Sequence, residues 1–219
     1  MPASLSRETI AAPARPEAGF MTVLSAPSGG GKTTILKCLL AVGDPDFQYS
    51  VSATTRQPRN GEVNGRDYYF LTPEEFHRRI QAGEFIEFAY VHGNFYGTPR
   101  AEVQTWMAQG KIVLLDLDVQ GGLNVKRQMG ARALLIFIRP PSLEALRQRL
   151  ELRNTDRPED IAARMDTARH ELEQAQFYDH VVINMDLEST VRQVREIINH
   201  RRQQTADSQP RGLDIVKKE

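Results

Sequence analysis

Short runs of apolar residues alternate with segments of helical spacing along most of this chain. Apolar runs without polar alternation predict buried strands at 20–25, 112–117, 133–138 and 181–183. Segments whose apolar residues recur every three or four positions predict helices at 33–40, 143–150, 156–176 and 191–198. Strands of a parallel sheet read as continuous apolar runs because helices cover both of their faces. The pattern therefore predicts an α/β fold with a parallel central sheet in a three-layer arrangement.

The segment 50–98 breaks this rhythm. It contains Asn-Gly turn signals at 60–61 and 64–65, a helix start at Thr72, and a further strand at 85–91. We expect a small mixed insertion, mostly of strands, in the α/β core. At the two ends of the chain, residues 1–19 and 204–219 lack any period and predict disordered tails around a folded unit at 20–203.

Composition and charge narrow the possible chemistry. The 28 Lys and Arg residues balance 28 Asp and Glu residues, so the basic surplus typical of general nucleic-acid binding is absent. Cys38 is the only cysteine, which excludes an internal disulfide framework and predicts a reducing compartment. The longest apolar run, 133–138, is far shorter than the ~20 residues that span a bilayer. We therefore expect a soluble cytoplasmic protein with neither nucleic-acid nor membrane partners.

The strongest chemical signal follows the first predicted strand, in the sequence APSGGGKT at 26–33. It matches the phosphate-loop pattern G-x-x-x-x-G-K-[ST], except that Ala26 replaces the first glycine. Glycines let backbone N–H groups approach phosphate oxygens, and the following helix adds its positive end. Lys32 would then reach the β- and γ-phosphates of a nucleotide, and the Thr33 hydroxyl would ligate Mg²⁺. A flexible glycine-rich turn that happens to contain a lysine is the alternative.

Asp116 and Asp118 lie at the end of the predicted strand 112–117, Asp118 one position after it. A carboxylate at this place beside a phosphate loop is the usual Walker B arrangement, which orients Mg²⁺ or its waters. Residues two apart on a strand point the same way, so both carboxylates are expected to face the phosphate site. An ordinary pair of strand-end carboxylates is the alternative.

Arginines suggest a second anionic ligand. Arg56 and Arg59 lie three residues apart in a proline-containing loop and suit a dianionic phosphate, with Tyr68 and Tyr96 as further donors. A solvated basic loop without a ligand is the alternative.

A second arginine group lies in the predicted helices after residue 142. Arg149 and Arg153 are i and i+4 on one helix face, and Arg164 follows. Arginines brought in by a mobile lid stabilise the anionic oxygens of phosphoryl transfer. An exposed arginine-rich helix face is the alternative.

Several separated motifs together resemble the bacterial guanylate kinase family. They are SAPSGGGK (25–32), SVSATTRQPRNGE (50–62), GRDYYF (65–70), GNFYGT (93–98) and DLDVQG (116–121). The element Thr-Thr-Arg-x-Pro-Arg-x-Gly-Glu is far more specific than a phosphate loop alone. The resemblance extends from about residue 21 to about residue 200, which is nearly the whole predicted folded unit.

This resemblance implies a P-loop nucleoside monophosphate kinase that transfers the γ-phosphoryl group of ATP to GMP, and also to dGMP, with Mg²⁺ as cofactor. The implied organisation is a core at 20–49, 99–146 and 166–203, a GMP-binding insertion at 50–98, and a helical lid at 147–165. ATP and GMP are the expected partners, and a homodimer is a candidate assembly.

The resemblance also assigns residues by position. For ATP it implies Pro27, Ser28, Gly29, Gly30, Gly31, Lys32, Thr33, Thr34, Arg149, Arg153 and Arg164, with Asn184 beside adenine. For GMP it implies Arg56, Arg59, Tyr68 and Tyr96 at the phosphate and Ser52, Glu87, Thr98 and Asp118 at the guanine. Guanine N1–H and N2–H₂ are donors that carboxylates accept, and hydroxyls can donate to its O6. The expected catalytic residues are Lys32, Arg56, Asp116, Arg149 and Arg153, with Thr33 and Asp116 holding Mg²⁺ directly or through water.

Two other functions fit the same fold. Guanylate-kinase-like binding modules keep the fold but lose the nucleotide chemistry, whereas here Gly31-Lys32-Thr33 is intact. A related kinase acting on a ribose bisphosphate would not need the base-reading carboxylates Glu87 and Asp118.

Overall fold

The computed structural model describes residues 19–91, 93–152 and 158–207. Its central sheet has five strands in the order β2-β7-β1-β8-β9, and every neighbouring pair is parallel. The strands are β1 (Phe20–Ser25), β2 (Phe47–Tyr49), β7 (Ile112–Asp116), β8 (Ala133–Arg139) and β9 (His180–Ile183). The predicted parallel α/β core is therefore confirmed.

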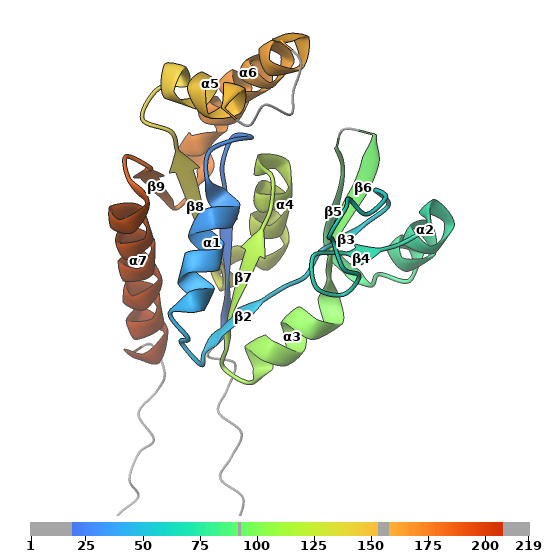
Figure 1. The fold of residues 1–219 in the computed structure, drawn as a ribbon. Coiled ribbons are helices and arrows are strands. Elements are labelled where there is room, and N and C mark those ends of the chain that lie inside the picture. The colour runs from blue at the N-terminus through green and yellow to red at the C-terminus, as the bar shows by residue number, and fades with distance from the viewer. Residues whose placement is uncertain (1–18, 92, 153–157, 208–219) are drawn as a thin grey trace, which may run out of the picture.

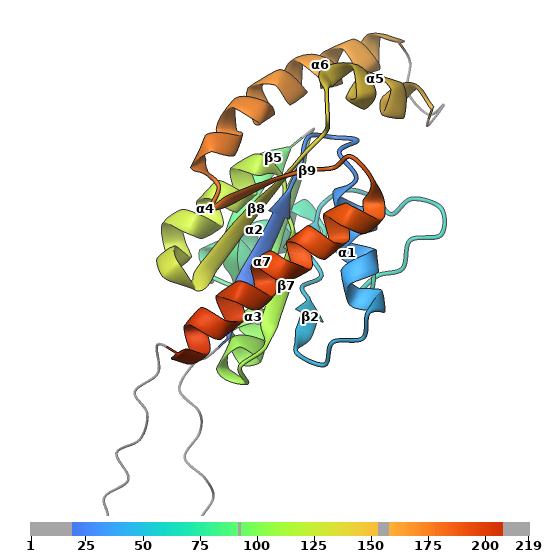
Figure 2. The ribbon, with the colours of Figure 1, turned by 90° about the vertical axis from the view of Figure 1, so that its left-hand side faces the viewer.

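Helices cover both faces of this sheet (Figures 1 and 2). On one face, α1 (Lys32–Ala41) and α7 (Leu187–Asp207) share a buried cluster with the strands. On the other face lie α3 (Arg100–Ala108) and α4 (Val119–Met129), which the 3₁₀ turn η1 (Gly130–Arg132) follows. The apolar strand runs are thus enclosed on both sides, which is the three-layer arrangement. Helix α7 ends at Asp207, beyond the bound of 203 expected for the folded unit.

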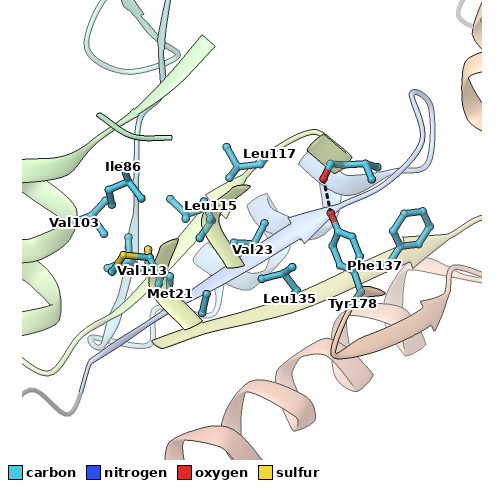
Figure 3. Close-up of a cluster of buried hydrophobic side chains, with 14 of the residues drawn as sticks. Met21, Val23, Ile86, Val103, Val113, Leu115, Leu117, Leu135, Phe137 and Tyr178 are labelled. Atoms are coloured by element: carbon cyan, nitrogen blue, oxygen red, sulfur yellow. Dashed lines mark hydrogen bonds between the residues drawn. The ribbon is translucent and has the colours of Figure 1, made fainter. Parts of the chain in front are cut away.

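The cluster on the α3 and α4 face ties the insertion to the core (Figure 3). Met21 and Val113 come from the central sheet, Val103 comes from α3, and Ile86 reaches the same cluster from the insertion. At the other end of the cluster, the Tyr178 hydroxyl donates to the carbonyl oxygen of Val119 at 3.2 Å. The insertion is therefore anchored by apolar packing beside the central sheet.

The insertion is a second, four-stranded sheet with a helix. Its strand order is β4-β3-β6-β5, with β3 and β4 parallel and the other pairs antiparallel. The elements are β3 (Ala53–Thr54), β4 (Tyr69–Phe70), α2 (Pro73–Gln81), β5 (Phe85–Val91) and β6 (Asn94–Pro99). Thr72 caps α2 as predicted, accepting from the backbone N–H of Glu75 at 3.2 Å. The expected small mixed insertion, mostly of strands, is therefore present, and its domain bounds of 50–98 stay a prediction.

Two further helices, α5 (Leu143–Glu151) and α6 (Pro158–Glu173), lie over the carboxyl ends of the central strands (Figure 1). Ser142 caps α5, as expected, and the 3₁₀ turn η2 (Gln174–Phe177) follows α6. The two helices share their own small core of Leu146, Leu150, Met165 and Ala168. This core includes residues just outside the expected lid bounds of 147 and 165. Asp156, the expected start of the longer helix, lies outside the described residues.

Within the described ranges, none of the helices has the length and apolar character needed to cross a membrane.

Candidate active site

The phosphate loop joins β1 to α1, and its shape depends on three glycines, of which Gly30 and Gly31 have the closest neighbours. Gly31 stands at the N-cap of α1 with φ +93°, and a Cβ atom there would lie 2.7 Å from Nδ2 of Asn184. A Cβ atom on Gly30 would lie 2.8 Å from the methyl group of Ala26. Ala26 is buried, so the replacement of the usual first glycine is accommodated by packing against Gly30. The loop is closed by a hydrogen bond from Gly30 N–H to the Pro27 carbonyl at 2.8 Å.

Three of the predicted catalytic and metal-binding residues meet at the end of β7. Lys32 Nζ lies 2.8 Å from Oδ1 of Asp116 and donates to the Leu117 carbonyl at 2.6 Å. The Thr33 hydroxyl donates to the other carboxylate oxygen of Asp116, Oδ2, at 3.0 Å. The structure therefore brings together the phosphate-loop lysine, a hydroxyl and a strand-end carboxylate, as the motif spacing predicts. Thr34, the next loop residue, is exposed on the first turn of α1.

These oxygens fit a magnesium ion bound chiefly by its substrate. Mg²⁺ prefers hard oxygen ligands, and it is usually held by one or two carboxylates together with substrate phosphates and waters. Thr33 and Asp116 supply one hydroxyl and one carboxylate in direct contact. Among the residues that the structure describes, no group of three or more His, Cys, Asp or Glu side chains could hold a metal by itself.

A cavity of about 390 Å³ opens between the phosphate loop, the insertion and the helices α4 and α6. Ser28, Lys32 and Asp116 from the predicted ATP side line it, together with the predicted GMP residues Ser52, Tyr68, Glu87, Tyr96 and Asp118. Residues expected to bind two different substrates thus face one space. This cavity is the candidate active site.

Glu87 is the most deeply buried acid in this cavity, with 4% of its surface exposed. Thr98, fully buried beside it, donates its hydroxyl to Glu87 Oε1 at 2.8 Å. Burial raises the pKa of Glu87 well above its usual range, to about 7; the Thr98 hydrogen bond lowers it, and the charge of Asp118 raises it. A hydroxyl has one hydrogen to donate, so this contact leaves Thr98 none for guanine O6.

Asp118 differs from its expected placement. Strand β7 ends at Asp116, and Asp118 is the N-cap of α4, where its Oδ1 accepts from the N–H of Gly121 at 2.6 Å. The expectation that Asp116 and Asp118 point the same way from one strand is wrong. The first turn of a helix has unpaired N–H groups, and the carboxylate at its cap satisfies one of them. Asp118 still lines the cavity.

A neighbouring cavity of about 570 Å³ holds the predicted phosphate-binding arginines. Arg56, Arg59, Arg164 and Tyr96 line it. Arg56 makes two hydrogen bonds to Glu62, at 3.0 and 2.8 Å, and its guanidinium lies 5.3 Å from the centre of the Tyr68 ring. The hydrogen bond to Glu62 is the largest cause of a raised Arg56 pKa. Glu62 itself was not singled out in the sequence, although it ends the most specific motif.

Asn184 and the lid arginines contact the phosphate loop or its support. The buried Asn184 donates from Nδ2 to the Gly30 carbonyl at 2.9 Å, and its Oδ1 lies 3.2 Å from the Thr190 hydroxyl. Arg149 donates to the backbone carbonyl of Asn184 at 3.1 Å, and Arg164 donates to the Ser28 hydroxyl at 3.3 Å. The Asn184 amide is therefore engaged by the protein, and a place beside adenine stays a prediction. Arg153 lies outside the described residues.

Sequence reasoning missed two residues of α6, Thr167 and Glu171, which line both cavities. Oε2 of Glu171 is buried and finds no hydrogen-bond partner in the part of the chain that the structure describes. The signal for these residues was helical spacing, because they lie three and seven positions after Arg164 and so share its helix face.

Comparisons with known proteins show which family this chain resembles. The family model described as guanylate kinase matches residues 19–201. A guanylate kinase of Porphyromonas gingivalis is 46% identical over 81% of this chain and 95% of that protein. Another, from Cereibacter sphaeroides, is 44% identical over 91% of this chain and 94% of that protein. The crystal structure of guanylate kinase from Anaplasma phagocytophilum matches with a TM-score of 0.71 and 36% identity, covering 85% of this chain and 87% of that one.

Proposed function

Because this chain belongs to the guanylate kinase family, we propose that the two adjoining cavities carry its reaction with the residue roles described below. The chain is an ATP:GMP phosphotransferase, which produces ADP and GDP. One observation carries the assignment of roles: the Lys32–Asp116–Thr33 cluster and the buried Glu87–Thr98 pair line or support a single cavity. Phosphoryl transfer requires donor and acceptor to meet in one such closed space.

The phosphate loop binds ATP in this proposal. Its backbone N–H groups and the positive end of α1 face the phosphate oxygens, and Lys32 offsets the charge that develops on them during transfer. Thr33 and Asp116 are the residues that would hold Mg²⁺, which when bound neutralises charge on the β- and γ-phosphates. The lid residues Arg149 and Arg164, with Arg153, add positive charge and help to exclude water when the site closes.

Guanine recognition falls to the first cavity. The Thr98 contact occupies Oε1 of Glu87, and the Gly121 contact occupies Oδ1 of Asp118. One oxygen of each carboxylate is thus left for guanine N1–H and N2–H₂. We assign the hydroxyl donor for O6 to Ser52, and we assign to Thr98 the orientation of Glu87.

The GMP phosphate falls to the second cavity, at Arg56, Arg59 and Tyr96, and Tyr68 contributes from the first cavity. Arg56 is a planar donor fork that pairs well with phosphate oxygens. Glu62 holds this fork in place from one side, through the two hydrogen bonds described above. This arrangement positions the accepting phosphate oxygen near the phosphate loop, since Ser28 and Tyr96 line both cavities.

A coupled assay of ADP formation tests these assignments. GMP, dGMP, AMP, CMP and UMP are offered in turn, with Mg²⁺ and then with excess chelator. We expect turnover with GMP and dGMP alone, and its loss with chelator. Equal turnover with AMP would contradict the roles of Glu87 and Asp118, and undiminished turnover in chelator would contradict the metal. A homodimer and a cytoplasmic location remain proposals, which analytical ultracentrifugation and cell fractionation would check.

A further inference from the structure

The wall between the two cavities has a distinct chemical composition. Four residues line both of them: Ser28, Tyr96, Thr167 and Glu171. The first cavity contains the proposed guanine-binding side chains, and the second contains the proposed phosphate-binding arginines. In a nucleoside monophosphate the ribose connects base and phosphate. A substrate that spans both cavities therefore places its ribose against this shared wall.

Within the wall, Glu171 offers a buried acceptor that has no partner in the part of the chain that the structure describes. The Thr167 hydroxyl donates back to the Ala163 carbonyl at 3.1 Å, and the Ser28 hydroxyl accepts from Arg164 at 3.3 Å. Oε2 of Glu171 is buried with no partner among the described residues. A buried carboxylate oxygen without a donor is costly, so its retention at this place calls for a donor on the substrate.

The donors that GMP offers narrow the choice of partner for Glu171. Burial raises the pKa of Glu171 to about 7, the charge of Asp118 raises it further, and Lys32 and the backbone of Ser28 lower it. On GMP, the guanine donors are already matched by Glu87 and Asp118, and the ionised phosphate has no donor to offer. The ribose hydroxyls are the donors that remain. Carboxylates recognise ribose hydroxyls in the same way in dinucleotide-binding proteins.

We propose that Glu171 is a substrate-binding residue that accepts a hydrogen bond from a ribose hydroxyl of GMP. This proposal rests on the placement of guanine and phosphate given under the proposed function. A different role would be to brace the phosphate loop through Ser28, in which case the residue would act on ATP. The two roles differ in which substrate responds to loss of the carboxylate.

The test measures kcat/KM of the wild type, Glu171→Ala and Glu171→Gln with GMP, 2′-deoxy-GMP and 3′-deoxy-GMP. Glu173→Ala is the matched control, because it removes a glutamate from the same helix whose side chain is 70% exposed. In the wild type, loss of the contacted hydroxyl should lower kcat/KM by about tenfold or more, the usual effect of a hydrogen bond to a charged group. In Glu171→Ala that analogue should perform like GMP, while the KM for ATP stays unchanged.

Glu171→Gln should keep part of the discrimination, because its amide oxygen still accepts, and Glu173→Ala should behave as the wild type. One deoxy analogue should be a poorer substrate than GMP for the wild type but not for Glu171→Ala. The hydroxyl that this analogue lacks is the contacted one. The proposal is overturned if Glu171→Ala lowers activity by the same factor with all three substrates, or if its main effect is on the KM for ATP. A wild type inactive with GMP would instead contradict the proposed function, so the two failures are distinguishable.

Discussion

Nδ2 of Asn184 donates a hydrogen bond to the carbonyl oxygen of Gly30 at 2.9 Å, although the two residues are 154 positions apart in the sequence. The contact joins the segment after β9 to the middle of the phosphate loop. It also explains part of the glycine requirement, because a Cβ atom on Gly31 would meet the same Asn184 amide. The shape of the nucleotide-binding loop therefore depends on a side chain from the far end of the folded chain.

Replacing Asn184 with Ala should destabilise the protein even without nucleotide. The change leaves the buried Gly30 carbonyl without its donor, which typically costs about 1–3 kcal/mol. The Thr190 hydroxyl keeps its shorter contact, to the Asp186 carbonyl at 2.6 Å, so the main loss falls on the loop. Chemical denaturation should show the lower stability. Steady-state kinetics should show that the KM for ATP rises more than the KM for GMP, each compared with the wild type. Unchanged stability together with an altered preference between ATP and GTP would indicate a contact to adenine instead.

Lys32→Ala should nearly abolish transfer while the fold persists. The lysine supplies positive charge where the phosphate oxygens gain negative charge, and groups of this kind contribute several kcal/mol to the transition state, about 3–4 in comparable sites. Lys37→Ala is the control, since Lys37 is exposed on the same helix. Circular dichroism melting checks the fold and a coupled assay measures the rate. A folded variant that keeps more than roughly a tenth of the wild-type rate, an effect below ~1.4 kcal/mol, would contradict the assigned role.

Glu87→Gln should impair GMP and spare ATP. The variant keeps the shape of the side chain but removes the charge and offers a donor where guanine also offers donors. The loss in kcat/KM for GMP should be roughly 1.5–3 kcal/mol, the usual value for a hydrogen bond to a charged group. Most of it should appear in the KM for GMP. Kinetics with each nucleotide varied separately decide the point, with the exposed Glu84→Gln as control. An equal rise in the KM for GMP and the KM for ATP would mean that Glu87 does not contact the base.

Guanosine binding should weaken as the pH falls from 8 to 6. The raised pKa of Glu87, about 7, means that the free carboxyl becomes protonated over this range, whereas guanine N1–H and N2–H₂ require an acceptor. Below the pKa, affinity should fall by up to about tenfold per pH unit, because ever fewer molecules carry the ionised form. Guanosine is chosen over GMP because the phosphate titrates in the same range.

Isothermal titration calorimetry at pH 6, 7 and 8 measures this dependence. Glu171→Gln is the matched variant, because Glu171 lines the same cavity and also has a pKa of about 7. Its titration therefore contributes to the pH dependence of guanosine affinity as well. Guanosine affinity should change less with pH in the Glu87→Gln protein than in the Glu171→Gln protein. If guanosine affinity depends on pH as steeply in the Glu87→Gln protein as in the wild type, Glu87 is excluded as the titrating group.

Features that depend on near neighbours in the chain were predictable from the sequence. The apolar runs became strands of one parallel sheet, and Thr72 and Ser142 cap their helices as expected. The order of strand, glycine-rich turn and helix predicted the phosphate loop and hence its Lys32–Asp116–Thr33 cluster. Periodicity and capping involve residues up to about four positions apart, so a linear pattern contains the information they require.

Other features were decided by the tertiary structure alone. Asp118 became a helix cap because the chain leaves β7 two residues earlier, and Thr98 gives its hydroxyl hydrogen to Glu87 on the adjacent strand. Glu171 reaches the shared wall because α6 lies across the strand ends. In each case a polar side chain takes the donor or acceptor that packing brings within about 3 Å. Apolar periodicity predicts which face of an element is buried, but the partner of a polar atom depends on distances between segments far apart in the chain.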